Sequence, residues 1–140
     1  MKIITHKEIV ELNISQKDCF KWVEDVIKNK KEDLLPAKIS MKPMPGVFCN
    51  VMPSIVKVDN KMYGGVKMVT RYPDRTPSLD SQIILFDAET GQTLGFIDAN
   101  WITAMRTGSV AAYSIKLFAK NDYKEIGIKL LCLTAPKQVP

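Results

Sequence analysis

The sequence predicts an α+β fold in which N-terminal helices precede a mainly antiparallel mixed sheet and one long helix closes the domain. Three observations predict it. Two helix-capping signals lie near the N-terminus, several extended segments separated by turn residues occupy the middle of the chain, and residues 100–120 form a long helical stretch without proline.

The N-terminal region is expected to form two helices. Residues 5–8 have the Thr-x-x-Glu form of a capping box, and residues 15–18 read Ser-x-x-Asp with the same spacing. These signals predict a short helix at 6–12 and a longer amphipathic helix at 16–30. Pro36 prevents a helix from continuing further.

The central region is expected to supply the sheet. Asp59 and Asn60 are typical turn residues, and Gly91 stands where a hairpin turn needs a positive φ. Between such turns the chain is predicted to be extended at 37–42, 47–57, 61–72, 82–87 and 93–98.

Composition narrows the class of protein. The chain has 140 residues, 46% of them hydrophobic and 25% charged, which is typical of a globular protein. No apolar run reaches the roughly 18 residues of a membrane span, and charges interrupt any signal-peptide core. Three widely spaced cysteines and a single histidine predict reduced thiols in the cytoplasm and no metal site. The net charge of +5 includes the cluster 28–31, which we interpret as a solvated helix end, without nucleic-acid binding.

Lys67 is the first candidate functional residue. Strand alternation places it in a segment that is apolar on both faces, so the ammonium is expected to be at least half-buried. Such a group should pair with an anion or lose its proton more readily. Gly64 and Gly65 leave room for a small ligand beside it. The pattern is equally compatible with an edge-strand lysine whose amine reaches water.

Arg106 is the second candidate, because it is the only charged side chain among the small and apolar residues 99–115. Its guanidinium is expected to reach off the helix towards an anion. A structural role, in which Arg106 ties the helix to the sheet through Asp98 or Asp87, remains an alternative. Two further residues are ambiguous: Lys38 follows Pro36 and could face solvent, and Ser78 could merely stabilise a turn.

Four segments together resemble the ornithine cyclodeaminase and mu-crystallin family over residues 1–128. They are MPSIV at 52–56, GGVKMVTRYP around Lys67, PSLDSQIILFDAETGQTLGFIDANWITAMRTGSVAA from Pro77, and KEIGI at 124–128. The resemblance implies an N-terminal α+β substrate domain that builds a homodimer and precedes an NAD(P)-binding Rossmann domain. It implies hydride-transfer chemistry on small amino or imino acids, such as ornithine cyclodeamination, alanine dehydrogenation or ketimine reduction.

The resemblance also assigns roles to individual residues. Lys67 corresponds to the substrate-binding lysine, and Arg106 to the arginine that contacts the substrate carboxylate near the cofactor. Ser78 corresponds to a residue that contacts the nucleotide. Lys38 stands where the family usually has a substrate-binding arginine. The lysine offers a carboxylate only a point charge, in place of the planar two-pronged guanidinium of arginine.

The C-terminal residues depart from the family. After the run at 124–128 the family has a glycine-rich phosphate-binding turn, whereas no glycine follows Gly127 here. We therefore expect residues 1–122 to form the substrate-binding and dimerisation domain, and residues 123–140 to be the truncated start of a Rossmann domain. On this hypothesis the chain contains no catalytic residue, is inactive by itself and does not bind NAD or NADP, although the complete family member does.

Two classes of function follow. The first is the N-terminal part of an NAD(P)-dependent enzyme acting on an amino or imino acid. The second is a stand-alone module that binds small carboxylates or dimerises without catalysis. In either case an incomplete fold is expected to expose apolar sheet edges and to dimerise or dissolve poorly.

Overall fold

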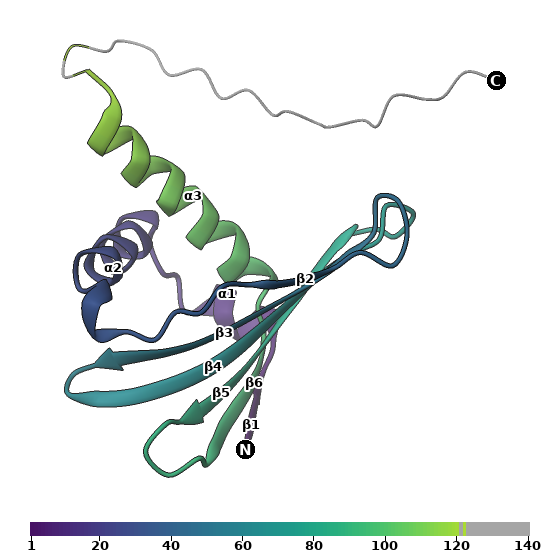
Figure 1. The fold of residues 1–140 in the computed structure, drawn as a ribbon, viewed down its shortest axis with the longest axis horizontal. Helices are drawn as coiled ribbons and strands as arrows, with labels where there is room; N and C mark the ends of the chain where they lie inside the picture. The colour runs from purple at the N-terminus through teal and green to yellow at the C-terminus, as the bar shows by residue number, and fades with distance from the viewer. Residues whose placement is uncertain (121, 123–140) are drawn as a thin grey trace.

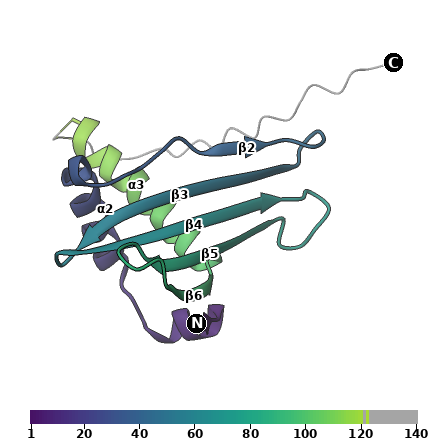
Figure 2. The same ribbon diagram turned by 60° about the horizontal axis from the view of Figure 1, so that its bottom comes forward.

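The computed structural model describes residues 1–120 and 122, and it shows one sheet with helices on one side (Figures 1 and 2). The six strands lie in the order β1-β6-β5-β4-β3-β2. The elements are β1 (Lys2–Ile4), α1 (His6–Glu11), α2 (Gln16–Lys28), the 3-10 turn η1 (Lys30–Glu32), β2 (Ile39–Met41), β3 (Phe48–Val58), β4 (Lys61–Arg71), β5 (Leu79–Asp87), β6 (Thr93–Asp98) and α3 (Asn100–Phe118).

This architecture confirms the predicted α+β class, with one addition. The sequence reasoning missed β1, a strand of three residues that pairs in parallel with β6. Every other pairing between named strands of the described chain is antiparallel. A parallel partner so distant in sequence has no local signal, because no turn connects it to its neighbour. The strand predicted at 124–128 lies outside the described residues.

Both capping signals form the predicted hydrogen bonds. The amide of Thr5 donates to the Glu8 carboxylate at 2.7 Å, and the amide of Glu8 donates back to the Thr5 hydroxyl at 3.4 Å. The reciprocal pair at Ser15 and Asp18 begins α2 in the same way. These bonds satisfy amides that have no partner inside the helix, which explains where α1 and α2 begin.

The turns also adopt the predicted backbone conformations. Asp59 and Asn60 have φ angles of 49° and 63°, as a two-residue hairpin turn requires, and Gly91 has a φ of 73°. Beside Gly91, the carboxylate of Asp87 pairs with the Lys61 amine at 2.9 Å and accepts two turn amides. The Lys61 hydrogen bond, followed by the amide of Thr90, lowers the pKa of Asp87 to about 2.

Pro53 lies within β3 without interrupting it. It pairs in continuous register with Val66 of β4. Two residues further on, the amide of Ile55 points away from β4 and donates to Leu34. The nitrogen of Pro53 also points away from β4, towards the side on which β2 lies. Because β2 does not extend as far as Pro53, the missing N–H removes no sheet hydrogen bond.

The helices are attached to the sheet and to each other by a few buried contacts. The hydroxyl groups of Ser81 on β5 and Thr103 on α3 are 2.8 Å apart, and the amide of Ala99 donates to the Ser81 carbonyl. Between α2 and α3, the rings of Phe20 and Tyr113 meet edge to face with their centroids 6.1 Å apart. These contacts set the position of α3 over the sheet.

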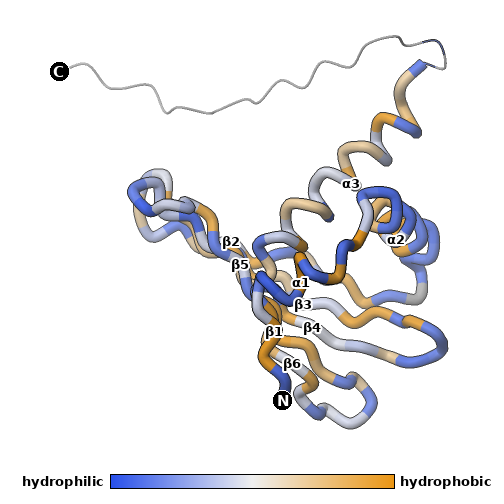
Figure 3. Tube along the Cα trace, turned by 180° about the vertical axis from the view of Figure 1, so that it is seen from behind, coloured by the Kyte–Doolittle hydropathy of each residue, from blue (hydrophilic) through white to orange (hydrophobic). Residues whose placement is uncertain are grey.

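The opposite face of the sheet carries no helix (Figures 1 and 2). Hydrophobic segments nevertheless run along the strands, while the hairpin ends are hydrophilic (Figure 3). Apolar side chains are exposed on both edge strands, as expected: Ile3 of β1 is 65% exposed, and Ile39 and Met41 of β2 are 58% and 49% exposed. The bare face of the sheet exposes apolar side chains as well. None of the described helices is both long enough and apolar enough to cross a membrane.

Candidate carboxylate-binding site

Lys67 lies in the interior of the sheet, on the face covered by the helices. Strand β4 is flanked by β3 and β5, so Lys67 is not the edge-strand lysine of the alternative interpretation. It pairs with Met52 on one side and Ile83 on the other, and Ile83 pairs in turn with Ile97, which lines the cavity beneath the helices. Directly opposed residues share a face of a sheet, so Lys67 points to the helix side.

The immediate surroundings of Lys67 are apolar. Met52 and Ile83 flank it across the strands, and Gly65 and Val69 precede and follow it on the same face. Val69 is buried, and the Lys67 side chain is partly buried. The ammonium is therefore held among groups that offer it no acceptor, as predicted from the strand pattern.

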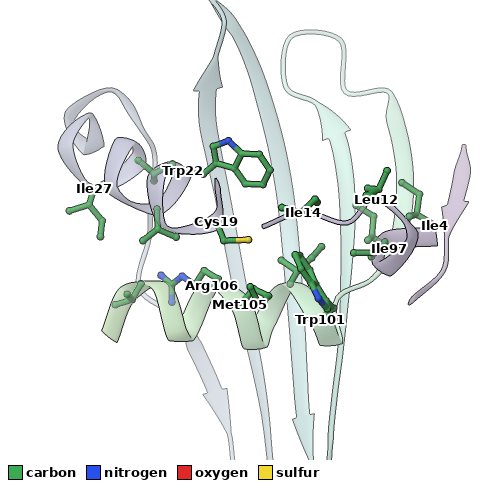
Figure 4. Close-up of a pocket in the computed structure, with 15 residues that line it drawn as sticks. Ile4, Leu12, Ile14, Cys19, Trp22, Ile27, Ile97, Trp101, Met105 and Arg106 are labelled. Carbon is green, nitrogen blue, oxygen red and sulfur yellow. The ribbon is translucent and has the colours of Figure 1, made fainter. Parts of the chain in front are cut away.

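Arg106 lies on the side of α3 that faces the rest of the domain. Thr103, three residues earlier, bonds to β5, and Ser109 and Tyr113 on the same side are buried. Arg106 itself is exposed, and it lines a cavity of about 480 Å³ between the helices and the sheet. Figure 4 places it between α3 and α2, beside Met105. It is the only charged residue among those that line this cavity.

The two cations interact with each other. Burial lowers the pKa of Lys67, and the positive charge of Arg106 lowers it further. Arg106 lines the cavity, whereas Lys67 is not among its lining residues. Within the described part of the chain, neither side chain forms an ion pair or a hydrogen bond. An anion bound by both side chains would offset their repulsion and give each of them a hydrogen-bond acceptor.

The structural alternative for Arg106 is not supported. Asp87 is occupied by Lys61, and the carboxylate of Asp98 accepts the amide of Asn100 at the start of α3, at 3.0 Å. Both carboxylates that were considered as partners therefore have other roles. Arg106 is left with its guanidinium available for a ligand.

Lys38 is exposed and lies just before β2. Ile39 of β2 pairs with Val51 of β3, so extending this antiparallel register by one residue brings Lys38 opposite Met52. Met52 in turn pairs with Lys67 of β4. Lys38 and Lys67 thus share a row of the sheet two strands apart, about 10 Å between backbones. The substrate-binding role of Lys38 stays a prediction.

A shallow pocket adjoins Lys38 and contains residues that sequence reasoning missed. It is lined by Lys38, Ser40, Lys42, Phe48 and Asn50, which alternate along β2 and β3 and so share one face. The side-chain oxygen assigned in Asn50 is buried and lacks a hydrogen-bond partner among the described residues. The alternation of Lys38, Ser40 and Lys42 was the available signal, but a lysine every second residue also suits a solvated strand.

Ser78 lies apart from the two cations. It stands in the loop between β4 and β5, where its carbonyl accepts the amide of Tyr72 at 2.9 Å. The end of β4 is about 13 Å along the strand from Lys67, given the rise per residue. No hydrogen bond among the described residues engages the Ser78 hydroxyl. The loop is held by Arg75 and Asp80, 3.7 Å apart, and by Asn100 of α3, which donates to Asp80.

The sequence and the fold match a known family. The sequence model of the ornithine cyclodeaminase/mu-crystallin family matches residues 1–129. The chain belongs to this family. The expected resemblance is thereby confirmed.

Individual family members show which parts are shared. The ketimine reductase mu-crystallin of Mus musculus is 33% identical over 90 residues, which are 61% of this chain and 26% of the mouse protein. The Δ1-pyrroline-2-carboxylate reductase of Thermococcus litoralis, solved in complex with NADH and L-proline, is 27% identical. It covers 87% of this chain and 39% of its own, with a TM-score of 0.76.

An archaeal alanine dehydrogenase, solved as a dimer with bound NAD, is 25% identical and has a TM-score of 0.74. Its match covers 87% of this chain and 38% of its own. The chain thus spans about two fifths of these solved structures, and about a quarter of the mouse protein.

Proposed function

We propose that this domain binds the carboxylate of a small amino or imino acid, as the substrate domain of an NAD(P)-dependent reductase, dehydrogenase or cyclodeaminase. The observation that carries the proposal is the pair formed by Lys67 and Arg106. Burial and the positive charge of Arg106 lower the pKa of Lys67, and neither cation has a carboxylate partner in the described chain, so the pair is suited to hold an external anion. The NADH and L-proline bound by the similar Thermococcus litoralis enzyme support the class of substrate and cofactor.

The two cations would have different tasks. The planar guanidinium of Arg106 suits bidentate binding of a carboxylate, and α3 holds it in place through the bond between Thr103 and Ser81. Lys67 supplies a point charge from the sheet on the other side of the ligand. Lys38 would add a weaker, more mobile charge, because it is exposed and precedes the strand.

The residues present partly fit a nicotinamide cofactor. The Ser78 hydroxyl and the Arg106 guanidinium are both uncommitted in the described chain, and both can bond to phosphate or ribose oxygens. When bound, the cofactor would supply or accept the hydride. The domain boundary proposed at 122/123 would place the rest of the cofactor site outside residues 1–122.

Isothermal titration calorimetry of the chain with L-proline, L-alanine and L-ornithine tests this proposal. L-Prolinamide is the matched control, since it lacks only the carboxylate. We expect binding of at least one amino acid and none of the amide. Equal binding of L-proline and L-prolinamide, or no binding of any carboxylate, would overturn the proposal.

The same titration with NAD and NADH separates the two classes of function. Carboxylate binding accompanied by nicotinamide binding and turnover would identify an enzyme that is active by itself. Carboxylate binding without either would favour the stand-alone module. The substrate-domain proposal predicts carboxylate binding and no turnover by this chain.

We further propose that two copies associate through the bare face of the sheet. Ile3, Phe96, Ile84, Val66 and Pro53 are paired in succession across five strands and form an apolar row on this face. Ile84 and Phe96 are 44% and 39% exposed. Two such faces can pack on each other as sheets do in a sandwich. The dimer of the similar archaeal alanine dehydrogenase supports a second copy as the occupant.

Replacing Ile84 with lysine is expected to convert the dimer into a monomer, because a charge at the centre of the row would be buried without a partner. Sedimentation velocity of both proteins measures this. Val10→Lys is the matched control, since Val10 is 46% exposed but lies on α1, on the other side of the sheet. A wild-type monomer at high concentration would contradict the proposal, and so would a dimer that survives Ile84→Lys.

A further inference from the structure

Lys67 differs from the paired lysines of the described chain in two respects. Lys28, Lys61 and Lys116 are each 2.8–2.9 Å from a carboxylate oxygen of Glu24 or Asp87. Lys67 has instead an apolar frame and a neighbouring guanidinium. Removal from water and a nearby cation are the two conditions that turn a lysine amine into a nucleophile for carbonyl carbons.

We propose that Lys67 forms a reversible imine with a small 2-oxo acid whose carboxylate is bound by Arg106. The inference rests on the proposed function only in giving Arg106 the carboxylate. It goes beyond that function by assigning Lys67 covalent chemistry with a carbonyl compound.

The step needs no oxidant or reductant. The neutral amine of Lys67 adds to the carbonyl carbon, and the π electrons of the C=O bond move to its oxygen. After one proton passes from nitrogen to oxygen, the hydroxyl group leaves with the second nitrogen proton as water, and the nitrogen lone pair forms the C=N bond. The sum is amine plus 2-oxo acid giving imine plus water, and hydrolysis reverses it.

The arrangement of the neighbours favours this reaction. In a 2-oxo acid the carbonyl carbon is bonded directly to the carboxylate, so a carboxylate held by Arg106 presents the carbonyl to the adjacent amine. Gly65, on the same face as Lys67, leaves space for a small substituent. A methyl group built on Gly65 would approach only the Ile84 carbonyl oxygen at 3.6 Å and the Ile83 side chain at 4.0 Å. The ligand is therefore expected to be short.

The acid–base properties of Lys67 agree with this geometry. Burial, and next the charge of Arg106, lower the pKa of Lys67, which increases the fraction of neutral amine at a given pH. Two surface lysines that pair with carboxylates shift in the opposite direction. The hydrogen bond that Lys28 donates to Glu24 raises the pKa of Lys28, and the one that Lys61 donates to Asp87 raises the pKa of Lys61. Lys67 should therefore react before these lysines do.

Reductive trapping tests the proposal. The folded chain is incubated with pyruvate and sodium cyanoborohydride, which reduces an imine to a stable secondary amine, and the labelled lysine is located by peptide mass spectrometry. We expect the adduct on Lys67 in preference to every other lysine. Labelling spread evenly over the exposed lysines would overturn the proposal.

Three variants sharpen the test. Lys67→Arg keeps the positive charge but cannot form the imine, and it should lose the specific adduct while retaining the far-ultraviolet circular dichroism of the folded chain. Arg106→Gln should lower the yield on Lys67 by about tenfold, the effect of one lost charge-assisted hydrogen bond. Lys28→Arg, at a surface lysine that pairs with Glu24, is the matched control and should leave the yield unchanged. Equal yields in Arg106→Gln and the unaltered chain would overturn the role of Arg106.

Calorimetry with L-lactate separates failure of this inference from failure of the proposed function. Lactate carries the carboxylate of pyruvate but has no carbonyl at the neighbouring carbon. If lactate binds and pyruvate leaves no adduct on Lys67, the imine is disproved and the carboxylate site stands. If neither lactate nor any amino acid binds, the carboxylate site is disproved as well.

Discussion

Replacing Arg106 with methionine is expected to weaken the binding of small carboxylates by about 100-fold. The guanidinium can donate two charge-assisted hydrogen bonds, which together contribute on the order of 3 kcal/mol, and tenfold in affinity corresponds to about 1.4 kcal/mol. Methionine is similar in length and apolar, so it should preserve the lining of the cavity beside α3. Titration calorimetry with L-proline measures the loss.

The same substitution has a second, independent readout at Lys67. Burial remains as the main cause of the lowered pKa, but the repulsion from Arg106 disappears. The pKa of Lys67 should therefore rise in Arg106→Met, which a nuclear magnetic resonance titration of the lysine side chains can follow. An unchanged pKa would show that the two cations are not neighbours.

The control for both measurements is Lys116→Met. It removes one positive charge from the same helix, but Lys116 is exposed and lies about 15 Å further along α3, given the rise of 1.5 Å per residue. Lys116 already pairs with Glu24 at 2.8 Å. Affinity should be nearly unchanged in this variant. Equal losses in the two variants would indicate general electrostatic attraction in place of a specific site.

Tyr113→Ala is expected to have the largest effect on stability, lowering the free energy of unfolding by about 3–5 kcal/mol. Tyr113 is 7% exposed and packs against Phe20 between α2 and α3. Few side chains of the described domain are as buried, so removing this ring takes a large share of the helix packing. Chemical denaturation followed by circular dichroism measures the change.

Tyr113→Phe is the matched control, because it keeps the ring. The hydroxyl of Tyr113 makes no hydrogen bond to the described residues, so its loss should cost less than about 1 kcal/mol. If Tyr113→Ala destabilises the chain no more than Tyr113→Phe does, the contact between α2 and α3 does not hold the fold together.

Local features were predictable because their causes lie within a few residues of chain. A capping box needs a hydroxyl and a carboxylate three positions apart, and both Thr5 with Glu8 and Ser15 with Asp18 formed the expected bonds. The glycine of the β5–β6 turn likewise has the expected positive φ. The helix predicted at 16–30 extends two residues too far. Helix α2 ends at Lys28, and residues 30–32 form a 3-10 turn.

The site was predictable only in part. The pattern around Lys67 predicted an ammonium at least half-buried, and the isolated charge of Arg106 predicted a guanidinium that reaches off the helix towards an anion, with an ion pair to Asp98 or Asp87 as the alternative. Neither pattern says that the two meet, because they lie on different elements. The register of β4 with β5 and the bond between Ser81 and Thr103 place α3 over the face that carries Lys67, and the charge of Arg106 contributes to the lowered pKa of Lys67.

By itself, then, the sequence determined the helix starts, the tight turns, the α+β class and the family, because these depend on neighbouring residues or on motifs in a fixed order. Only the tertiary structure decided that β1 pairs with β6 and which face of the sheet remains bare. The strands are apolar on both faces, so alternation could not distinguish the side that binds helices from the side left for a partner.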